Sequence, residues 1–305
     1  MTDSAPAPVA DAPPENWVDT SAPAFARPFL RLARADRPIG TWLLLLPCWW
    51  SVALATEDWR NAWLLALFAL GAIVMRGAGC TYNDIVDRDI DAAVARTRSR
   101  PLPSGAVSLP AAWAFLVAQC LVGLAVLLAL NAYAIWLGFA SLALVAIYPF
   151  MKRLTDWPQI VLGLAFNWGA LMGWAAVTGG LSLAPVALYL GAVFWTVGYD
   201  TIYAHQDRED DAIVGVRSSA LRLGAATYKW MWLFYGAALA GFAAAGALAG
   251  LGLLFWLGLA LGAAHLVRQI RRLDIDDPSL CLQLFRSNRD FGFILFAAIL
   301  AGQFL

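Results

Sequence analysis

Long stretches of this 305-residue chain carry no Asp, Glu, Lys or Arg at all, namely residues 101–151, 157–199 and 230–267. A helix needs roughly 20 apolar residues to cross a bilayer, so each stretch is long enough for two spans. With the apolar runs before and after them, the pattern predicts about nine spans, at residues 39–56, 61–83, 111–130, 133–150, 158–177, 183–204, 226–246, 249–267 and 288–305.

Composition supports a membrane protein. The chain is 61% hydrophobic and 14% charged, whereas soluble domains are about 45–50% apolar and about 25% charged. This balance excludes an ordinary soluble globular protein. The fold class we predict is therefore all-α, a polytopic membrane protein embedded in the lipid bilayer, with no expectation of nucleic-acid binding.

The first 25 residues differ from the rest, because they are rich in Ala and Pro and contain four acidic residues. Such a composition predicts a short disordered tail, followed by a single transmembrane domain over residues 26–305. The tail has neither the apolar core of a signal peptide nor the Arg-rich character of a transit peptide. We therefore expect a bacterial inner membrane rather than an organelle.

The basic residues predict the orientation of the chain. With nine spans, the N-terminus and every second loop share one side, and that side carries 19 of the 21 Lys and Arg residues. Since loops rich in Lys and Arg stay in the cytoplasm, the N-terminus is expected to be cytoplasmic.

Two acidic clusters, residues 83–91 and 200–211, lie at the ends of the second and sixth predicted spans and hold nine of the 21 acidic residues. Ionisable groups at the edge of a membrane are costly and usually mark a site for ions or substrate. Both clusters fall on the cytoplasmic side. They therefore predict two half-sites that hold cations together with an anionic ligand.

Helical phase separates the carboxylates within each cluster. On a helix continuing from the second span, Asp84, Asp87 and Asp91 fall within an arc of about 60°, and Asp89 points elsewhere. In the second cluster, three carboxylates fall within about 40° and two turn away. Those that share the second arc are Asp200, Asp207 and Asp211.

The ligands that these clusters offer are oxygens, since the whole chain has only two His residues. Oxygen ligation favours Mg²⁺, which typically bridges carboxylates to substrate phosphates. Arg88 and Arg208 follow the central aspartates, and Lys152 with Arg153 lies at the exit of the fourth span. Basic residues of this kind bind phosphate, so we predict a diphosphate-bearing substrate.

A weak internal repeat indicates two equivalent halves. DRDID at 87–91 matches DREDD at 207–211, and each ends an apolar span, four spans apart. A duplicated four-helix unit followed by a ninth helix would leave this pattern.

The motifs resemble those of the UbiA family of intramembrane aromatic prenyltransferases. Asn83, Asp84, Asp87 and Asp91 fit its NDxxDxxxD pattern, and Asp207 with Asp211 fits DxxxD. The segments RPIGTWLLLLP (37–47), MRGAGCTYND (75–84), RPLPSGAV (100–107), YPFMKR (148–153) and YDTIYA (199–204) are similar to the 4-hydroxybenzoate polyprenyltransferase branch.

This resemblance implies nine helices around a central cavity that opens to lipid, in two pseudo-repeated halves. It implies Mg²⁺ bridging both aspartate motifs to a polyprenyl diphosphate, with Asn83 and Asp200 in support. The implied reaction attaches the polyprenyl chain to the ring carbon ortho to the hydroxyl of 4-hydroxybenzoate, releasing diphosphate, a step of ubiquinone synthesis.

The reaction needs further groups, and four residues are candidates by their positions along the chain. Tyr148 and Tyr203 are candidates to stabilise an allylic cation. The carboxylate of the aromatic acceptor needs a cationic partner, for which Arg76, inside the second span, and Arg37 are candidates.

Two alternatives stay open. One is a UbiA-type transferase with another acceptor, such as homogentisate, a naphthoate, haem or a sugar phosphate. The other is a secondary transporter, a class that also shows repeats and buried carboxylates. Transporters place such groups near the bilayer midplane, whereas these clusters lie at the cytoplasmic edge, which fits phosphate chemistry better.

Overall fold

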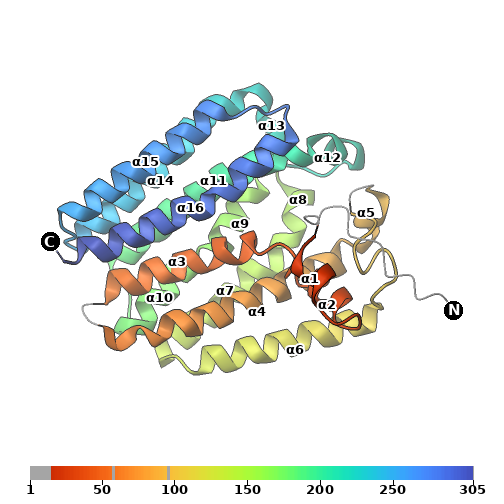
Figure 1. The fold of residues 1–305 in the computed structure, drawn as a ribbon, viewed down its shortest axis with the longest axis horizontal. Helices are drawn as coiled ribbons and strands as arrows, with labels where there is room; N and C mark the ends of the chain where they lie inside the picture. The colour runs from red at the N-terminus through yellow and green to blue at the C-terminus, as the bar shows by residue number, and fades with distance from the viewer. Residues whose placement is uncertain (1–14, 57–58, 95–96, 305) are drawn as a thin grey trace. The chain divides into compact units, whose positions relative to one another are not determined.

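The computed structural model describes residues 15–56, 59–94 and 97–304, except for the side chains of Trp59, Asp210, Asp211 and Val214. Every regular element among these residues is a helix (Figure 1). Of the tail predicted over residues 1–25, the first 14 lie outside the described residues, and Trp17–Thr20 forms the short helix α1.

The chain divides into two compact units. Unit 1 comprises residues 1–41 and 70–126, and unit 2 comprises residues 42–69 and 127–305. Helices α3 (Ile39–Ala55), α4 (Trp63–Val86) and α6 (Leu109–Leu128) contribute residues to both. Unit 1 also contains α1 (Trp17–Thr20), α2 (Arg27–Leu32) and α5 (Arg88–Ala93).

Unit 2 contains most of the helices. They are η1 (Trp59–Asn61), α7 (Ala132–Ile147), η2 (Tyr148–Phe150), α8 (Met151–Leu154), α9 (Pro158–Phe166), α10 (Gly169–Thr178), α11 (Leu183–Ala204), η3 (His205–Asp207), α12 (Arg208–Val214), α13 (Ser219–Leu223), η4 (Gly224–Ala226), α14 (Thr227–Leu248), α15 (Leu253–Arg272) and α16 (Pro278–Gly302).

Seven helical segments of the described chain are long and apolar enough to cross a membrane. They are Trp63–Val86, Leu109–Leu128, Ala132–Leu154, Pro158–Thr178, Leu183–Asp207, Ser219–Leu248 and Leu253–Arg272. The all-α, polytopic prediction is thus confirmed. The first predicted span corresponds to α3, which is apolar but has 17 residues. The last corresponds to α16, whose Arg286, Arg289 and Asp290 make it less apolar.

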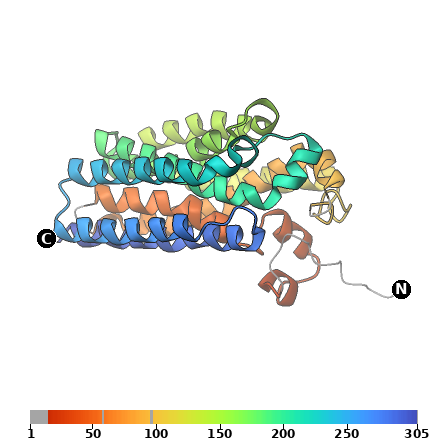
Figure 2. The same ribbon diagram turned by 90° about the horizontal axis from the view of Figure 1, so that it is seen from above.

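Unit 2 is built around α11. This helix packs against α9, α10, α14 and α16, while α14, α15 and α16 follow one another as helical hairpins, coloured cyan to blue in Figures 1 and 2. Its core is aromatic. Trp50 lies 5.2 Å from Trp195 and 5.6 Å from Phe242, between ring centroids, and Phe291 lies 5.5 Å from Trp195.

The indole N–H groups of this core are satisfied. Trp50 donates to the Gly292 carbonyl at 2.8 Å, and Trp195 donates to Asn288 Oδ1 at 2.8 Å. Because an unpaired polar group is expensive away from water, these bonds permit large aromatic side chains to fill the centre of the unit.

The predicted span 158–177 is not one continuous helix. α9 ends at Phe166 and α10 begins at Gly169, with Asn167 buried between them. The Asn167 amide donates to the Gly163 carbonyl at 2.8 Å and to Thr196 Oγ1 at 2.7 Å. Broken helices persist inside membranes where side chains satisfy the freed backbone groups, as happens here.

Candidate functional site

The first aspartate motif lies in unit 1, where the prediction of one continuous helix is wrong. α4 ends at Val86 and α5 begins at Arg88, so Asp87 sits between two helices. The Asp87 N–H still bonds to the Asn83 carbonyl at 2.9 Å, and the Asp91 N–H bonds to the Asp87 carbonyl at 2.8 Å. The four-residue spacing of helical bonds is therefore kept across the break.

Burial separates the carboxylates of this motif. Asp84, Asp87 and Asp91 are 0%, 1% and 5% exposed, whereas Asp89 is exposed and pairs with Arg88 at 3.1 Å. Asn83 is half-buried at the end of α4. Three buried carboxylates so close in the chain are costly unless cations compensate them.

Two arginines supply part of this compensation. Arg34 Nη2 donates to Asp84 Oδ1 at 2.7 Å. Arg100 Nη1 donates to Asp91 Oδ2 at 2.9 Å and lies 3.5 Å from Asp84 Oδ1. Neither arginine belonged to the predicted site. Both belong to the basic residues that the sequence places on the cytoplasmic side, and Arg100 begins the segment RPLPSGAV.

Thr97 and Arg100, which follow α5 in the chain, both contact Asp91 of the first motif. Thr97 Oγ1 donates to the Asp91 carbonyl at 2.9 Å, and this brings Arg100 to the Asp91 carboxylate. Burial raises the pKa of Asp91, and the negative charges of Asp84 and Asp87 act in the same direction. Arg100 opposes them without reversing the shift.

One oxygen in this cluster has no hydrogen-bond partner among the described residues. It is Asp84 Oδ2, which is fully buried. An orphaned buried oxygen beside two further carboxylates, all of them hard donors, fits a Mg²⁺ ion. The described residues contain no group of three or more His, Cys, Asp and Glu side chains able to hold a metal by itself. Mg²⁺ usually needs only one or two carboxylates, with substrate phosphates and water completing its shell.

Two further predicted residues of unit 1 have defined surroundings. Arg37 pairs with the buried Asp36 at 2.9 Å. Arg76 is half-buried in α4, and its guanidinium lies against Gly40 at the start of α3. A Cβ at position 40 would come 2.8 Å from Arg76 Nη2, closer than non-bonded atoms approach.

The second aspartate motif lies in unit 2, where a helix again breaks. α11 ends at Ala204, a 3₁₀ turn η3 follows, and α12 begins at Arg208. Asp200 and Asp207 are half-buried and Glu209 is exposed, while the side chain of Asp211 lies outside the described part. Arg208 Nη2 donates to Asp276 Oδ1 at 2.9 Å, so this predicted diphosphate ligand pairs with the loop before α16.

Buried hydrogen bonds fix the surroundings of this break. His205 Nε2 lies 3.0 Å from Thr227 Oγ1. Ser219 Oγ lies 2.7 Å from Thr201 Oγ1, and its N–H donates to Gln159 Oε1 at 3.2 Å. These bonds connect the end of α11 to α9, α13 and α14.

The basic pair at the exit of the fourth predicted span lies on α8. The Arg217 N–H donates to the Lys152 carbonyl at 2.8 Å, which ties α8 to the segment before α13. Lys152 is half-buried, and the exposed Arg153 has its guanidinium 5.8 Å from the centre of the Phe150 ring.

The two predicted tyrosines also belong to unit 2. Tyr148 is half-buried in η2, immediately before the basic pair. Tyr203, in the last turn of α11, lies 4.5 Å from Phe285, between ring centroids. In unit 1, the carboxylates of the first motif thus lie beside two arginines. The second motif, the basic pair Lys152 and Arg153 and the two tyrosines belong to unit 2. The joining of these two groups into one site stays a prediction.

The buried aspartates of the first motif offer oxygen donors of the kind that divalent cations prefer, next to arginines of the kind that bind phosphate. The model of the UbiA prenyltransferase family matches residues 44–298. The chain therefore belongs to the UbiA prenyltransferase family, which makes it a membrane prenyltransferase, and the resemblance read from its motifs is confirmed.

Three relatives with similar sequences share one name. The "4-hydroxybenzoate polyprenyltransferase, mitochondrial" of Drosophila melanogaster is 52% identical over 283 residues, which are 92% of this chain and 72% of the relative. The Homo sapiens protein of the same name is 48% identical over 289 residues, 93% of this chain and 77% of the relative. The Aedes aegypti protein is 51% identical over 278 residues, and the match spans 90% of this chain but 63% of that relative.

Solved structures of the family share the fold. The apo structure of a UbiA homolog from Aeropyrum pernix K1 is 29% identical with a TM-score of 0.71, over 85% of this chain and 96% of that one. The UbiA homolog from Archaeoglobus fulgidus bound to GPP and Mg²⁺ is 19% identical with a TM-score of 0.62, over 89% of this chain and 99% of that one.

Proposed function

We propose that this protein transfers a polyprenyl group from polyprenyl diphosphate to the ring carbon ortho to the hydroxyl of 4-hydroxybenzoate, a step of ubiquinone synthesis. The observation that carries the proposal is the 52% identity over 92% of the chain to the Drosophila 4-hydroxybenzoate polyprenyltransferase. Buried first-motif carboxylates and basic residues of the expected type support it.

The metal ligands follow from the two motifs. Asp84, Asp87 and Asp91 would hold one Mg²⁺ and Asp207 with Asp211 a second, supported by Asn83 and Asp200. When bound, Mg²⁺ would neutralise charge on the diphosphate as it departs. The orphaned Asp84 Oδ2 supports this assignment for the first motif.

The protein's own residues would position the diphosphate and the isoprenoid. Arg88, Lys152, Arg153 and Arg208 bind the diphosphate oxygens, and their positive charge favours breaking the allylic C–O bond. The aromatic faces of Tyr148 and Tyr203 stabilise the resulting allylic cation. The ring carbon of the phenol attacks that cation, and loss of the ring proton to solvent restores aromaticity.

The acceptor carboxylate needs a cation, and Arg76 is the first candidate, with Arg37 the second. Gly40 supports Arg76, because the missing Cβ makes room for its guanidinium beside α3.

Gly40→Ala is therefore expected to displace Arg76 and to raise the KM for 4-hydroxybenzoate about tenfold, the loss of one charge-assisted hydrogen bond. The KM for polyprenyl diphosphate should change little, and it serves as the internal control. Steady-state kinetics in detergent measure both constants. An equal rise in the two values would assign Gly40 to general packing and contradict the role given to Arg76.

Membrane placement belongs to the same proposal. The proposal counts α3 and α16 with the seven longer apolar segments, which gives nine spans. As the family resemblance implies, they would surround a central cavity in two pseudo-repeated halves, within a single transmembrane domain over residues 26–305. The N-terminus and both motifs face the cytoplasm, because 19 of 21 basic residues share that side. The bacterial inner membrane stays a prediction, since the relatives above are named as mitochondrial proteins.

The test is a product mass spectrum. Purified protein in lipid vesicles receives labelled 4-hydroxybenzoate and a polyprenyl diphosphate, with Mg²⁺ present or chelated. A carboxylated prenylphenol that forms only with Mg²⁺ supports the proposal. Product from homogentisate or a naphthoate instead would assign another acceptor, and solute flux without covalent product would assign a transporter.

A further inference from the structure

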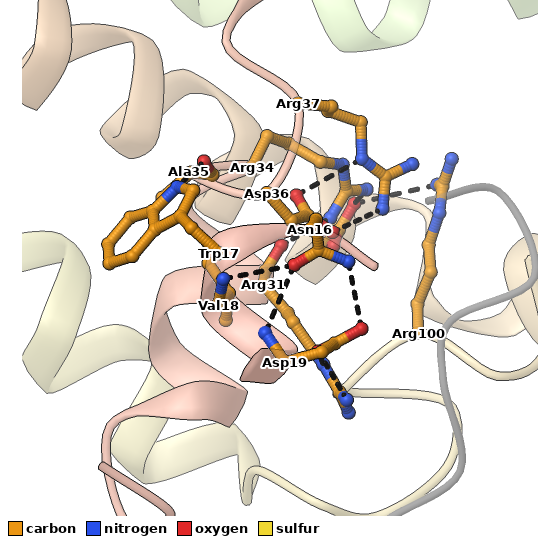
Figure 3. Close-up of polar contacts among 11 residues, drawn as sticks. Asn16, Trp17, Val18, Asp19, Arg31, Arg34, Ala35, Asp36, Arg37 and Arg100 are labelled. Atoms are coloured by element: carbon orange, nitrogen blue, oxygen red, sulfur yellow. Dashed lines mark hydrogen bonds and ion pairs between the residues drawn. The ribbon is translucent and has the colours of Figure 1, made fainter. Parts of the chain in front are cut away.

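The segment before the first span makes a set of polar contacts that includes Asn16, Asp19 and Arg31 (Figure 3). Arg34 links this set to Asp84 of the first aspartate motif. The set starts with Asn16, whose Oδ1 accepts the N–H groups of Val18 and Asp19 at 3.1 Å each. The Asn16 amide also donates to Asp19 Oδ2 at 2.8 Å. Asn16 thus caps α1 and orients the Asp19 carboxylate.

Two contacts fasten α1 to the chain around Arg34. Asp19 Oδ1 accepts from Arg31 Nε at 3.0 Å and from Arg31 Nη2 at 2.7 Å. The Trp17 indole N–H donates to the Ala35 carbonyl at 2.8 Å. We call the set Asn16, Trp17, Asp19 and Arg31 the N-terminal latch. It binds the Arg31 side chain on one side of Arg34 and the Ala35 carbonyl on the other.

Arg34 itself has an unusual backbone. Its φ is +57°, in the left-handed region that a residue with a Cβ rarely adopts. Strained conformations persist where the surroundings enforce them, and they concentrate at functional sites. Arg34 is also buried, and its Nη1 donates to the Arg31 carbonyl at 3.1 Å.

The conformation of Arg34 directs its guanidinium to Asp84. Nη2 donates to Asp84 Oδ1 at 2.7 Å, and this leaves the buried Oδ2 without a hydrogen bond among the described residues. The carboxylate is therefore held by one oxygen and offers the other. Within unit 1 the contacts run without a gap from Asp19 to Asp84.

We propose that the N-terminal latch is a positioning element of the enzyme. Trp17 and Asp19 act through Arg34 to orient Asp84 so that Oδ2 faces a divalent cation carried with the diphosphate. The inference rests on the proposed function, and it adds residues that precede the matched family region at 44–298. The latch residues act on Asp84 through Arg34 and need not touch substrate. Their effect should therefore appear as a change in the affinity for the divalent cation.

Two conservative variants test the latch. Asp19→Asn removes the charge that binds Arg31, and Trp17→Phe removes one N–H while keeping an aromatic ring. In each, the Mg²⁺ concentration that half-activates prenyl transfer should rise about tenfold, the lower end of the range found for groups that orient metal ligands. Asp19→Glu should recover most of the loss.

A second readout is independent of turnover. Mn²⁺ binding in the presence of inorganic pyrophosphate, followed by electron paramagnetic resonance, should weaken by a similar factor in both variants. Asp290→Asn is the charge-matched control, because Asp290 forms an exposed pair with Arg289 in α16. It should bind Mn²⁺ like the unchanged protein.

The order of action can be tested with Arg34→Gln. If the latch works through Arg34, adding Asp19→Asn to Arg34→Gln should produce no further loss of Mn²⁺ affinity. Fully additive losses would overturn the inference. So would unchanged Mg²⁺ half-activation in Trp17→Phe, or a fall in maximal rate with unchanged metal affinity, which would give the latch a structural role only. Absence of prenyl transfer in the unchanged protein would instead contradict the proposed function.

Discussion

Asp87→Asn is expected to lower the turnover of 4-hydroxybenzoate by about a thousandfold or more while the protein still inserts and folds. Asparagine keeps the size of the side chain and the backbone bonds to Asn83 and Asp91, so only the charge is lost. Metal-assisted charge stabilisation contributes several kcal/mol to a transition state, and about 1.4 kcal/mol corresponds to a factor of ten in rate. Asp207→Asn, the equivalent change in the second motif, should have a comparable effect.

Asp89→Asn is the matched control, because Asp89 lies two residues away, carries the same charge and is exposed. It should retain nearly full activity. Turnover is measured at saturating Mg²⁺, and folding by thermal unfolding in detergent. Near-normal, Mg²⁺-dependent activity in Asp87→Asn or Asp207→Asn would refute the two-motif account of catalysis.

The membrane helices could be predicted closely from local composition. The span predicted at 183–204 has the same bounds as α11, and the one predicted at 226–246 overlaps nearly all of α14. Charge-free runs determine such helices because the bilayer excludes charge and requires internal hydrogen bonding. Each helix can therefore be recognised without knowing its neighbours.

The breaks in the helices could not be predicted in this way. Asn167 interrupts an apolar run that has the length of one span. Its amide donates a hydrogen bond to Thr196, 29 residues later in the chain. Within α10, the Trp174 N–H likewise donates to Ser51, 123 residues earlier in the chain, at 2.9 Å. No local pattern encodes partners so distant in sequence, so a continuous helix was the natural prediction.

The aspartates of the candidate site were evident from the sequence, but their arginine partners were not. Carboxylates next to apolar runs stand out because such positions are costly for charge. Arg34 lies 50 residues from Asp84, among several arginines that all fit a topological role. Which arginine is buried against a carboxylate depends on tertiary packing and on the left-handed backbone at position 34.

Gly191→Ala is expected to destabilise the helical core of unit 2. Gly191 lets α11 approach α14, and a Cβ there would lie 2.9 Å from the Ala238 carbonyl oxygen and 3.0 Å from the Phe242 nitrogen. Backbone atoms cannot rotate away, so the two helices must separate along their shared face. Small residues permit close packing of helices in membranes, and overpacking a core typically costs about 1–3 kcal/mol. The thermal unfolding midpoint in detergent should fall by several degrees.

Gly236→Ala on α14 is the control, because a Cβ at that position meets no atom within 4 Å. Alanine favours a helix over glycine by about 0.5–1 kcal/mol, so this variant should be as stable as the unchanged protein or slightly more so. The same midpoint for both variants would contradict close packing of α11 on α14. Because Asp200 and Tyr203 lie on α11 as well, Gly191→Ala should also lower turnover. Lipids that restore the stability of this variant should restore its activity in parallel.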